Sequence, residues 1–313
     1  MNGNEFSALA SLQRADGAFP SVIVSPDGQA VSDFNCFTAA IVLRRLRNAP
    51  PSPERDKIVG RGLDWLTACR SARPPNAFSF WPDDDRPAWA TGVPADVDDT
   101  AIILCELLRH GRIGRAATLR IVCDAILPCR VKAAMLPVLP PWVAEGSFFT
   151  WIPPESSRAE PAKPFANIVD CCVNANVAAL LALLGTNSFP GHDAAIQTIV
   201  GGLQWAGQDP ARLSSLTPFY PSLIYLAEAV DHAVECGVTK LLEALAQLRL
   251  LAAGAPDGAA GICRSAYSRT VWHAPAADIA RAISSQHVLR VGSGRTEKDG
   301  FREPERSAHS PIL

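Results

Sequence analysis

Apolar residues recur every three or four positions along most of the chain, whereas strictly alternating apolar and polar positions are nearly absent. This period is typical of helices that bury one face or their whole surface. It predicts helices over residues 4–12, 33–47, 55–72, 96–110, 112–126, 166–185, 191–206, 219–235 and 237–253. The pattern therefore favours an all-α fold in which helices pack in layers around a common core.

Two segments interrupt this helical pattern, residues 73–95 and 136–164, and both are rich in proline. Proline lacks the N–H that a helix interior needs, so these segments form long loops. Both loops contain large aromatic residues, which favour ordered loops over solvated linkers, and ordered loops of this length are often functional. The aromatic residues are Trp81, Trp89, Trp142, Phe148, Phe149 and Trp151.

A weak repeat also runs through the chain, in which a helix is followed by a turn with a polar residue, a glycine and an aromatic residue. The clearest copy contains Gln13, Gly17 and Phe19, and looser copies span residues 62–82 and 202–222. Repeated helix pairs must stack to bury their apolar faces, and closing the stack into a ring removes its exposed ends. We therefore expect an α/α toroid, a barrel of paired inner and outer helices, over residues 1–255.

Composition limits the classes of partner and location. The chain has 313 residues, of which 48% are hydrophobic and 19% charged, so it can bury a large core. A net charge of -2 excludes the basic surface that nucleic acid binding requires. The chain shows neither a signal peptide nor an apolar run of transmembrane length. Nine cysteines at irregular positions favour a reducing cytoplasm.

From about residue 255 the helical pattern weakens. We expect a degenerate repeat over residues 256–313, and disorder from about residue 290, where charged residues follow no apolar period.

Three carboxylates, Asp96, Asp98 and Asp99, open the helix predicted at 96–110. One interpretation is structural: Asp96 caps the helix, Asp99 occupies the third helical position, and acidic residues suit the helix N-terminus. The other interpretation is chemical. Three carboxyl groups within one turn cannot all ionise at low cost, so at least one retains a proton and can act as an acid.

Two stretches resemble a known family. The turn from Gln13 to Phe19 is similar to the QW-type repeat of squalene–hopene cyclases, and residues 78–101 resemble the part of class II terpene cyclases that ends in the DxDD motif. The resemblance covers about residues 4–255. It implies proton-initiated cyclisation or isomerisation of an isoprenoid, with Asp98 as the acid, Asp96 and Asp99 in support, and no redox cofactor. Mg²⁺ enters only if the substrate is a diphosphate.

Cation chemistry also needs a dry cavity lined by aromatic faces. Polar residues on the apolar helix 166–185, Asp170 and Asn174, share one face and either brace a loop or reach into that cavity. The residues that we expect to contact substrate are Trp81, Trp89, Trp142, Phe149, Trp151, Asp170, Asn174, Phe219 and Tyr220.

Alternatives remain open. A non-catalytic toroid that binds an isoprenoid or a protein partner explains the carboxylates as a cap. Asp170 and Cys172 resemble the zinc ligands of protein prenyltransferase β subunits, but the matching segment continues with Pro221 where the third ligand is expected. The acidic run at residues 83–85 suggests magnesium–diphosphate binding as an alternative, but it lies between prolines, which favours a solvated loop.

Class II cyclases usually place the acid between two barrels, and this chain has room for about one. We therefore expect the cavity to be completed by a homodimer, by a second barrel partner, or by enclosure of a small substrate within the single toroid.

Overall fold

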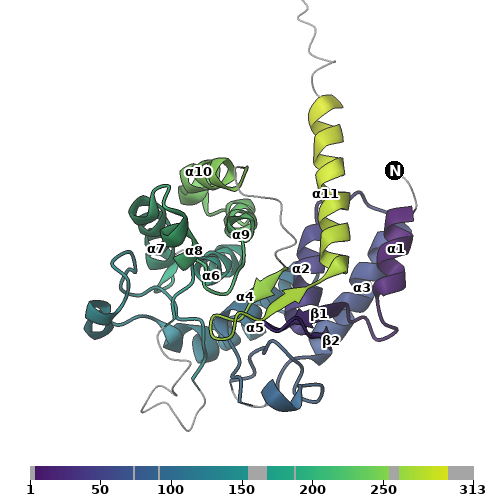
Figure 1. Ribbon diagram of the computed structural model, residues 1–313, viewed down its shortest axis with the longest axis horizontal. Helices are drawn as coiled ribbons and strands as arrows, with labels where there is room; N and C mark the ends of the chain where they lie inside the picture. The colour runs from purple at the N-terminus through teal and green to yellow at the C-terminus, as the bar shows by residue number, and fades with distance from the viewer. Residues whose placement is uncertain are drawn as a thin grey trace, which may run out of the picture.

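The computed structural model describes residues 4–72, 75–90, 92–153, 168–186, 188–253 and 261–294, and it is mostly helical with a small sheet (Figure 1). Each of the nine predicted helices is present, with ends that differ by a few residues. The α-helices are α1 (Asn4–Leu12), α2 (Cys36–Leu46), α3 (Pro53–Ala68), α4 (Val97–Arg109), α5 (Arg115–Ile121), α6 (Cys171–Leu183), α7 (His192–Ala206), α8 (Pro210–Ser215), α9 (Leu223–Glu235), α10 (Leu242–Ala253) and α11 (Pro275–Gly294).

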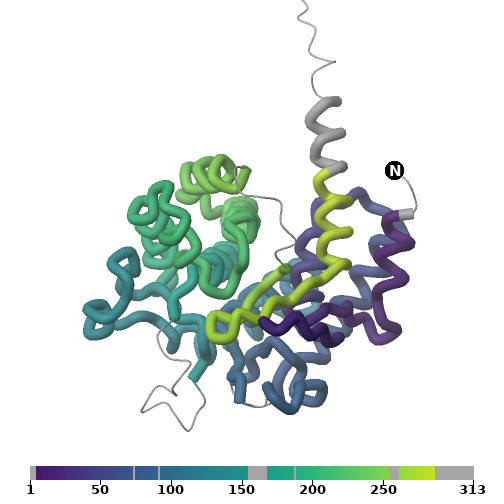
Figure 2. The backbone as a smooth tube through the Cα atoms, viewed as in Figure 1, coloured from purple at the N-terminus to yellow at the C-terminus, as the bar shows by residue number. Residues whose placement is uncertain are grey.

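The helices α2, α4, α6 and α9 form an inner row. Successive members of the row pack on each other, and α3, α7 and α10 pack outside α2, α6 and α9 (Figure 2). The inner helices carry apolar or small residues on nearly every side, so they can be buried all round: every residue of α2 is buried. Glu228 on α9 bonds Arg45 on α2 at 2.8 Å and Arg281 on α11 at 2.8 Å, which links the two ends of the row.

Side chains at the start of the inner helices fix where each helix begins. Asn35, Asp96, Asp170 and Ser222 are the N-caps of α2, α4, α6 and α9, and each accepts a hydrogen bond from a first-turn N–H. The first three of these bonds are 2.7 Å long. Such caps satisfy donors that a helix leaves unpaired, so the local sequence determines these starts.

A four-stranded antiparallel sheet has the order β2-β1-β4-β3. Its strands are β1 (Pro20–Val24), β2 (Ala30–Phe34), β3 (Cys263–Arg264) and β4 (Val271–His273). The all-α prediction lacked this sheet. The strands are too short for a clear alternating pattern, and β1 pairs with β4 across most of the chain length, Ile23 lying opposite Trp272.

Residues 261–294, which follow the predicted toroid in sequence, contribute to the main core. Trp272, Ala276 and Ile283 are buried, and α11 packs on α1 and α2. The disorder that we predicted concerns mainly residues 295–313, which lie outside the described residues.

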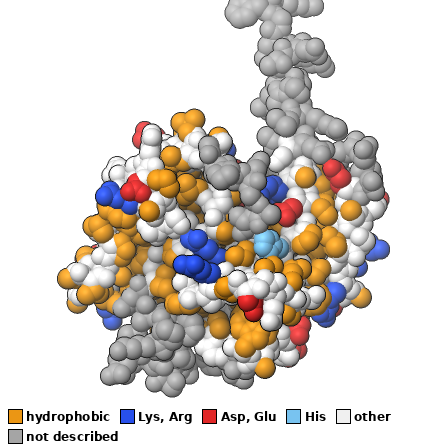
Figure 3. Space-filling view, viewed as in Figure 1, with side chains coloured by type: hydrophobic (Ala, Val, Ile, Leu, Met, Phe, Trp, Pro, Cys, Tyr) orange, Lys and Arg blue, Asp and Glu red, His pale blue; other side chains and the backbone are white. Residues whose placement is uncertain are grey.

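No single charge dominates the face of the molecule that Figure 3 draws. On the face drawn in Figure 3, acidic and basic side chains are scattered among apolar ones. No helix in the described residues is long and apolar enough to cross a membrane. All nine cysteines are free thiols.

Candidate active site

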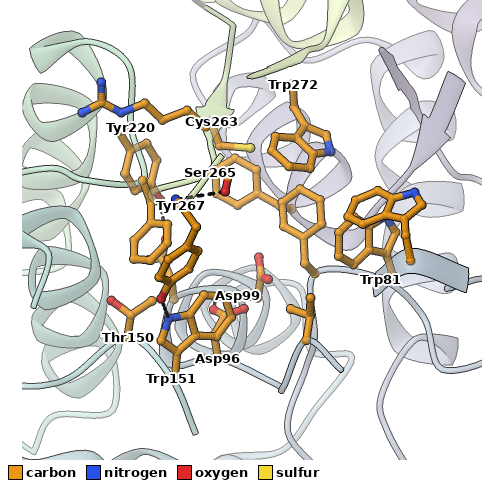
Figure 4. A pocket seen from close by; sticks show the side chains of 17 residues that line it. Trp81, Asp96, Asp99, Thr150, Trp151, Tyr220, Cys263, Ser265, Tyr267 and Trp272 are labelled. Atoms are coloured by element: carbon orange, nitrogen blue, oxygen red, sulfur yellow. Dashed lines mark hydrogen bonds between the residues drawn. The ribbon is translucent and has the colours of Figure 1, made fainter. Parts of the chain in front are cut away.

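A cavity of about 150 Å³ lies where the inner helices begin. Asp96, Asp98 and Asp99 line it together with aromatic residues. In Figure 4, Asp96 and Asp99 lie between Trp151 on one side and Trp81 on the other. The aromatic residues of the lining are Phe37, Phe80, Trp81, Trp89, Trp151, Phe219, Tyr220, Tyr267 and Trp272.

The aromatic rings hold each other in place. Phe80 packs edge-on against Trp81 at a centroid distance of 4.6 Å and against Trp272 at 5.4 Å. The Trp81 indole N–H donates to Asp33 at 2.7 Å, so this ring is fixed by a polar contact outside the cavity. Edge-to-face packing of this kind is favourable, and it turns ring faces and edges toward the interior.

Asp98 is the most firmly bonded carboxyl of the lining. It is 7% exposed, its Oδ1 accepts a hydrogen bond from Asn176 Nδ2 at 2.7 Å, and its Oδ2 accepts one from the Tyr220 hydroxyl. Burial raises the pKa of Asp98, and these two hydrogen bonds together with the charge of Arg44 oppose that rise. Burial therefore favours the neutral carboxyl, while donors are already in place for the anion.

Arg44 fixes the orientation of the Asn176 amide. Its Nη1 donates to Asn176 Oδ1 at 2.9 Å. A guanidinium can only donate, so the amide oxygen must face Arg44 and the amide nitrogen must face Asp98. Asp98 Oδ1 must then accept, and a proton on this carboxyl resides on Oδ2, beside Tyr220.

Asp96 and Asp99 interact with each other. Asp96 Oδ1 caps α4 by accepting from the Asp99 N–H, and burial raises the pKa of Asp96 to about 7. Burial, followed by the Asp96 charge, raises the pKa of Asp99 well above its ordinary value. Asp99 Oδ1 is buried and has no hydrogen-bond partner among the described residues. The cap interpretation therefore explains Asp96, and it leaves Asp98 and Asp99 unexplained.

The pair on α6 braces neighbouring loops. Asp170 caps α6 and its Oδ2 accepts from the Phe219 N–H at 3.2 Å, while Asn174 bonds both the N–H and the C=O of Phe148. Burial raises the pKa of Asp170 to about 7. The two side chains thus position the loops that contain Phe219 and Phe148, and neither is part of the lining.

The other expected residues divide between the cavity and the core. The cavity is lined by Trp81, Trp151, Phe219 and Tyr220. Trp89 also lines it, although this residue is 63% exposed to solvent.

Two aromatic residues that we expected to contact substrate are not part of the lining. Trp142 packs against Trp205 with ring centroids 6.5 Å apart, and the Phe149 N–H donates to the Cys129 carbonyl at 3.0 Å while Phe149 lies opposite Val169 in an isolated β-bridge. Both belong to loops whose aromatic residues point in different directions, and the sequence pattern does not show which way each one points.

Sequence reasoning missed Arg44 and Asn176, and it missed Tyr267 and Trp272 from the sheet. Asn176 is a polar residue on a strongly apolar helix, a feature that already drew attention to Asp170 and Asn174. Arg44 looks like a basic residue near a helix C-terminus.

The candidate metal ligands do not form a common site in the described part of the chain. In the described ranges no three His, Cys, Asp or Glu side chains form a group that could hold a metal ion. His232 lies near Cys236, with 3.7 Å between Nε2 and Sγ, and Asp170 is engaged as a helix cap. The run at residues 83–85 is exposed, and Asp83 pairs with Arg86 at 3.8 Å.

No family model matches the chain, and no curated protein matches it. Among solved structures it is similar to the type II terpene cyclase MstE from Scytonema without ligand, at 13% identity over 91% of this chain and 98% of that chain, with a TM-score of 0.46. A protein from Actinoplanes is 13% identical over 93% of this chain and 98% of that chain, also at 0.46.

A variant of MstE in complex with its substrate, geranylgeranyl dihydroxybenzoate, is 13% identical over 93% of this chain and 97% of that chain, at 0.42. We take the function of this chain from its own geometry.

Proposed function

We propose that this protein starts the cyclisation or isomerisation of an isoprenoid by protonating it with Asp98. One observation carries the proposal: a buried carboxyl group, held by Tyr220 and Asn176, faces a cavity whose lining is mostly aromatic. A neutral acid in an apolar chamber is what protonation of an alkene or epoxide requires.

The first step transfers the proton of Asp98 Oδ2 to one carbon of an alkene. The O–H bond breaks, the π electrons form the new C–H bond, and the neighbouring carbon becomes a cation. A second alkene of the same molecule then attacks that cation and closes a ring. Loss of a proton to the Asp98 carboxylate, or to water, ends the sequence and restores the charge balance.

The surroundings of Asp98 support both halves of this step. Burial raises the pKa of Asp98, which favours the protonated carboxyl before reaction. The Asn176 amide and the Tyr220 hydroxyl already point at the two oxygens where negative charge develops. Donors that are in place before reaction stabilise the transition state more than the reactant, so they lower the barrier to proton release.

The aromatic walls supply the second requirement. Ring faces stabilise a nearby cation through their quadrupole, and they offer no lone pair that could trap it. Trp272 lies across the cavity from Asp99 in Figure 4, and Phe37 and Phe80 also line the cavity. The apolar lining also disfavours the water that would quench the cation early.

We propose that a single toroid is sufficient for this activity. This proposal is supported by the row of α2, α4, α6 and α9, whose two ends Glu228 links, and by the hairpin of β3 and β4, which contributes part of the cavity wall from the same chain. A cavity of about 150 Å³ is similar in size to one that holds a benzene ring. One end of an isoprenoid, on the order of one isoprene unit, would therefore occupy it.

The test uses the intact protein in D₂O. Linear isoprenoids of ten to thirty carbons are incubated at neutral pH and the products are analysed by mass spectrometry. We expect a cyclic or isomerised product with one deuterium at the carbon that Asp98 protonates. Binding of the isoprenoids without any deuterated product would refute the enzyme and favour the non-catalytic toroid.

A further inference from the structure

The charged side chains that the cavity presents to a ligand are mostly acidic. Asp96, Asp98 and Asp99 line it, and Asp170 lies close enough for its pKa to be raised by Asp98. A phosphate group carries about -1.5 to -2 charges at neutral pH. Bringing such a group into a buried site costs desolvation unless a cation pairs with it, and any carboxyl group that is ionised there adds repulsion that water screens poorly.

Arg264 is the one cation among the described residues of the lining, and much of its guanidinium is occupied. Its Nε donates to the Pro218 carbonyl at 3.0 Å, and its Nη2 donates to the carbonyls of Ser214 and Thr217 at 3.3 Å. These bonds fasten strand β3 to the turn before Phe219. Diphosphate recognition normally uses several free Arg or Lys donors.

Helix N-termini are the other common anion sites, and here they are filled. One first-turn N–H group of each of α2, α4, α6 and α9 donates to the cap side chain, which is Asn35, Asp96, Asp170 or Ser222 respectively. A phosphate at one of these ends would have to displace a side chain of the protein from the position that the phosphate needs.

Mg²⁺ is poorly suited to link the carboxyl groups to a diphosphate by binding both. Metal ligands must be deprotonated, whereas burial raises the pKa of Asp96 to about 7 and that of Asp99 well above its ordinary value. The acidic lining therefore holds protons more readily than it holds a divalent cation.

From this lining we infer that the ligand is an uncharged isoprenoid, such as an alkene, an alcohol or an epoxide, and that prenyl diphosphates are disfavoured. This inference rests on the proposed function, because it takes the same cavity as the reaction site. The uncharged end of such an isoprenoid suits the aromatic walls, because it buries apolar surface without bringing a new charge into the interior.

Binding tests the inference directly. Geraniol and geranyl diphosphate share one carbon skeleton, so the pair differs only in the charged group. Trp81 and Trp272 line the cavity, so intrinsic tryptophan fluorescence can follow the titration of each ligand, with and without Mg²⁺. We expect a Kd for geraniol at least tenfold lower than that for the diphosphate. Equal or tighter binding of the diphosphate, with or without Mg²⁺, would overturn the inference.

A charge variant sharpens the comparison. Asp96→Asn removes the carboxyl group whose pKa of about 7 leaves it mostly ionised at pH 8, and it keeps a side chain that can cap α4, so the preference for geraniol at pH 8 should fall severalfold. An unchanged preference in a folded variant would contradict the electrostatic origin. The two proposals fail separately: tight geraniol binding without a deuterated product refutes only the enzyme, and a deuterated product made preferentially from the diphosphate refutes only the uncharged substrate.

Discussion

Replacing Asp98 by asparagine changes its chemistry and keeps its shape. The amide oxygen can still accept from Asn176, and the amide nitrogen can donate to the Tyr220 oxygen, which accepts as well as donates. Asp98 is not the cap of α4, because Asp96 fills that role. The variant should therefore fold normally and lack only the proton that can be transferred.

Two magnitudes follow from the structure. A positioned general acid typically contributes about 10²–10⁴ to the rate, and here no other group donates at the same point, so kcat should fall by about 10³ or more. Charges roughly 6 Å apart at an effective dielectric constant near 20 repel by about 3 kcal/mol. The carboxyl cluster is only partly ionised, so removing Asp98 should raise the free energy of unfolding at pH 8 by about 1 kcal/mol.

The assay combines product formation in D₂O with urea unfolding at pH 8. Asp84→Asn is the matched control, because it makes the same change at an exposed carboxyl and should alter neither quantity. Product at more than a tenth of the wild-type rate in the Asp98 variant would show that another group is the acid. A large loss of stability together with loss of product would indicate a structural role instead.

Three further predictions concern the surroundings of Asp98. Tyr220→Phe keeps the ring and removes one donor to the carboxylate, so steady-state kinetics should show kcat reduced by about 10²-fold with little change in KM; a change confined to KM would contradict this role. In Arg44→Gln the Asn176 amide is free to turn and the charge that lowers the pKa of Asp98 is gone. Activity needs the protonated acid and is lost as pH rises through its pKa, so kcat should fall and the alkaline limb of the pH profile should move to higher pH; a limb that moves to lower pH would oppose this reasoning. For Asp96, the pKa is raised to about 7 in the folded protein from about 4 in the unfolded chain. Its contribution to the free energy of unfolding is therefore complete below pH 4, and about 4 kcal/mol of it is lost as the pH rises to 7. Calorimetry should therefore give a higher Tm at pH 5 than at pH 8, with a smaller difference in Asp96→Asn, and equal pH dependence in both proteins would count against the raised pKa.

Local sequence was sufficient for much of the architecture. The period of apolar residues located the helices, because a helix must bury its apolar face wherever it finally packs. The cap at Asp96 was also predictable, since it involves a side chain and an N–H only three residues apart. The aromatic turns before α4 and α9 contain Trp81, Phe219 and Tyr220, which do line the cavity.

Other parts of the site depend on pairings that no short stretch reveals. Trp272 reaches the cavity because β4 pairs with β1, and each strand has too few residues to show its own pattern. Trp142 and Phe149 lie in the same loops as cavity residues and are not part of the lining. The direction of a loop side chain depends on the neighbours it packs against, which the sequence alone does not specify.

The sequence by itself determined that three carboxyl groups begin one helix, and it left their role open between a cap and an acid. Tertiary structure alone decided that Asp98 is buried and meets Asn176 from α6, Tyr220 from the turn before α9 and, through Asn176, Arg44 from α2. The reason is physical: burial and long-range hydrogen bonds control whether a carboxyl keeps its proton, and both arise only when distant helices pack together.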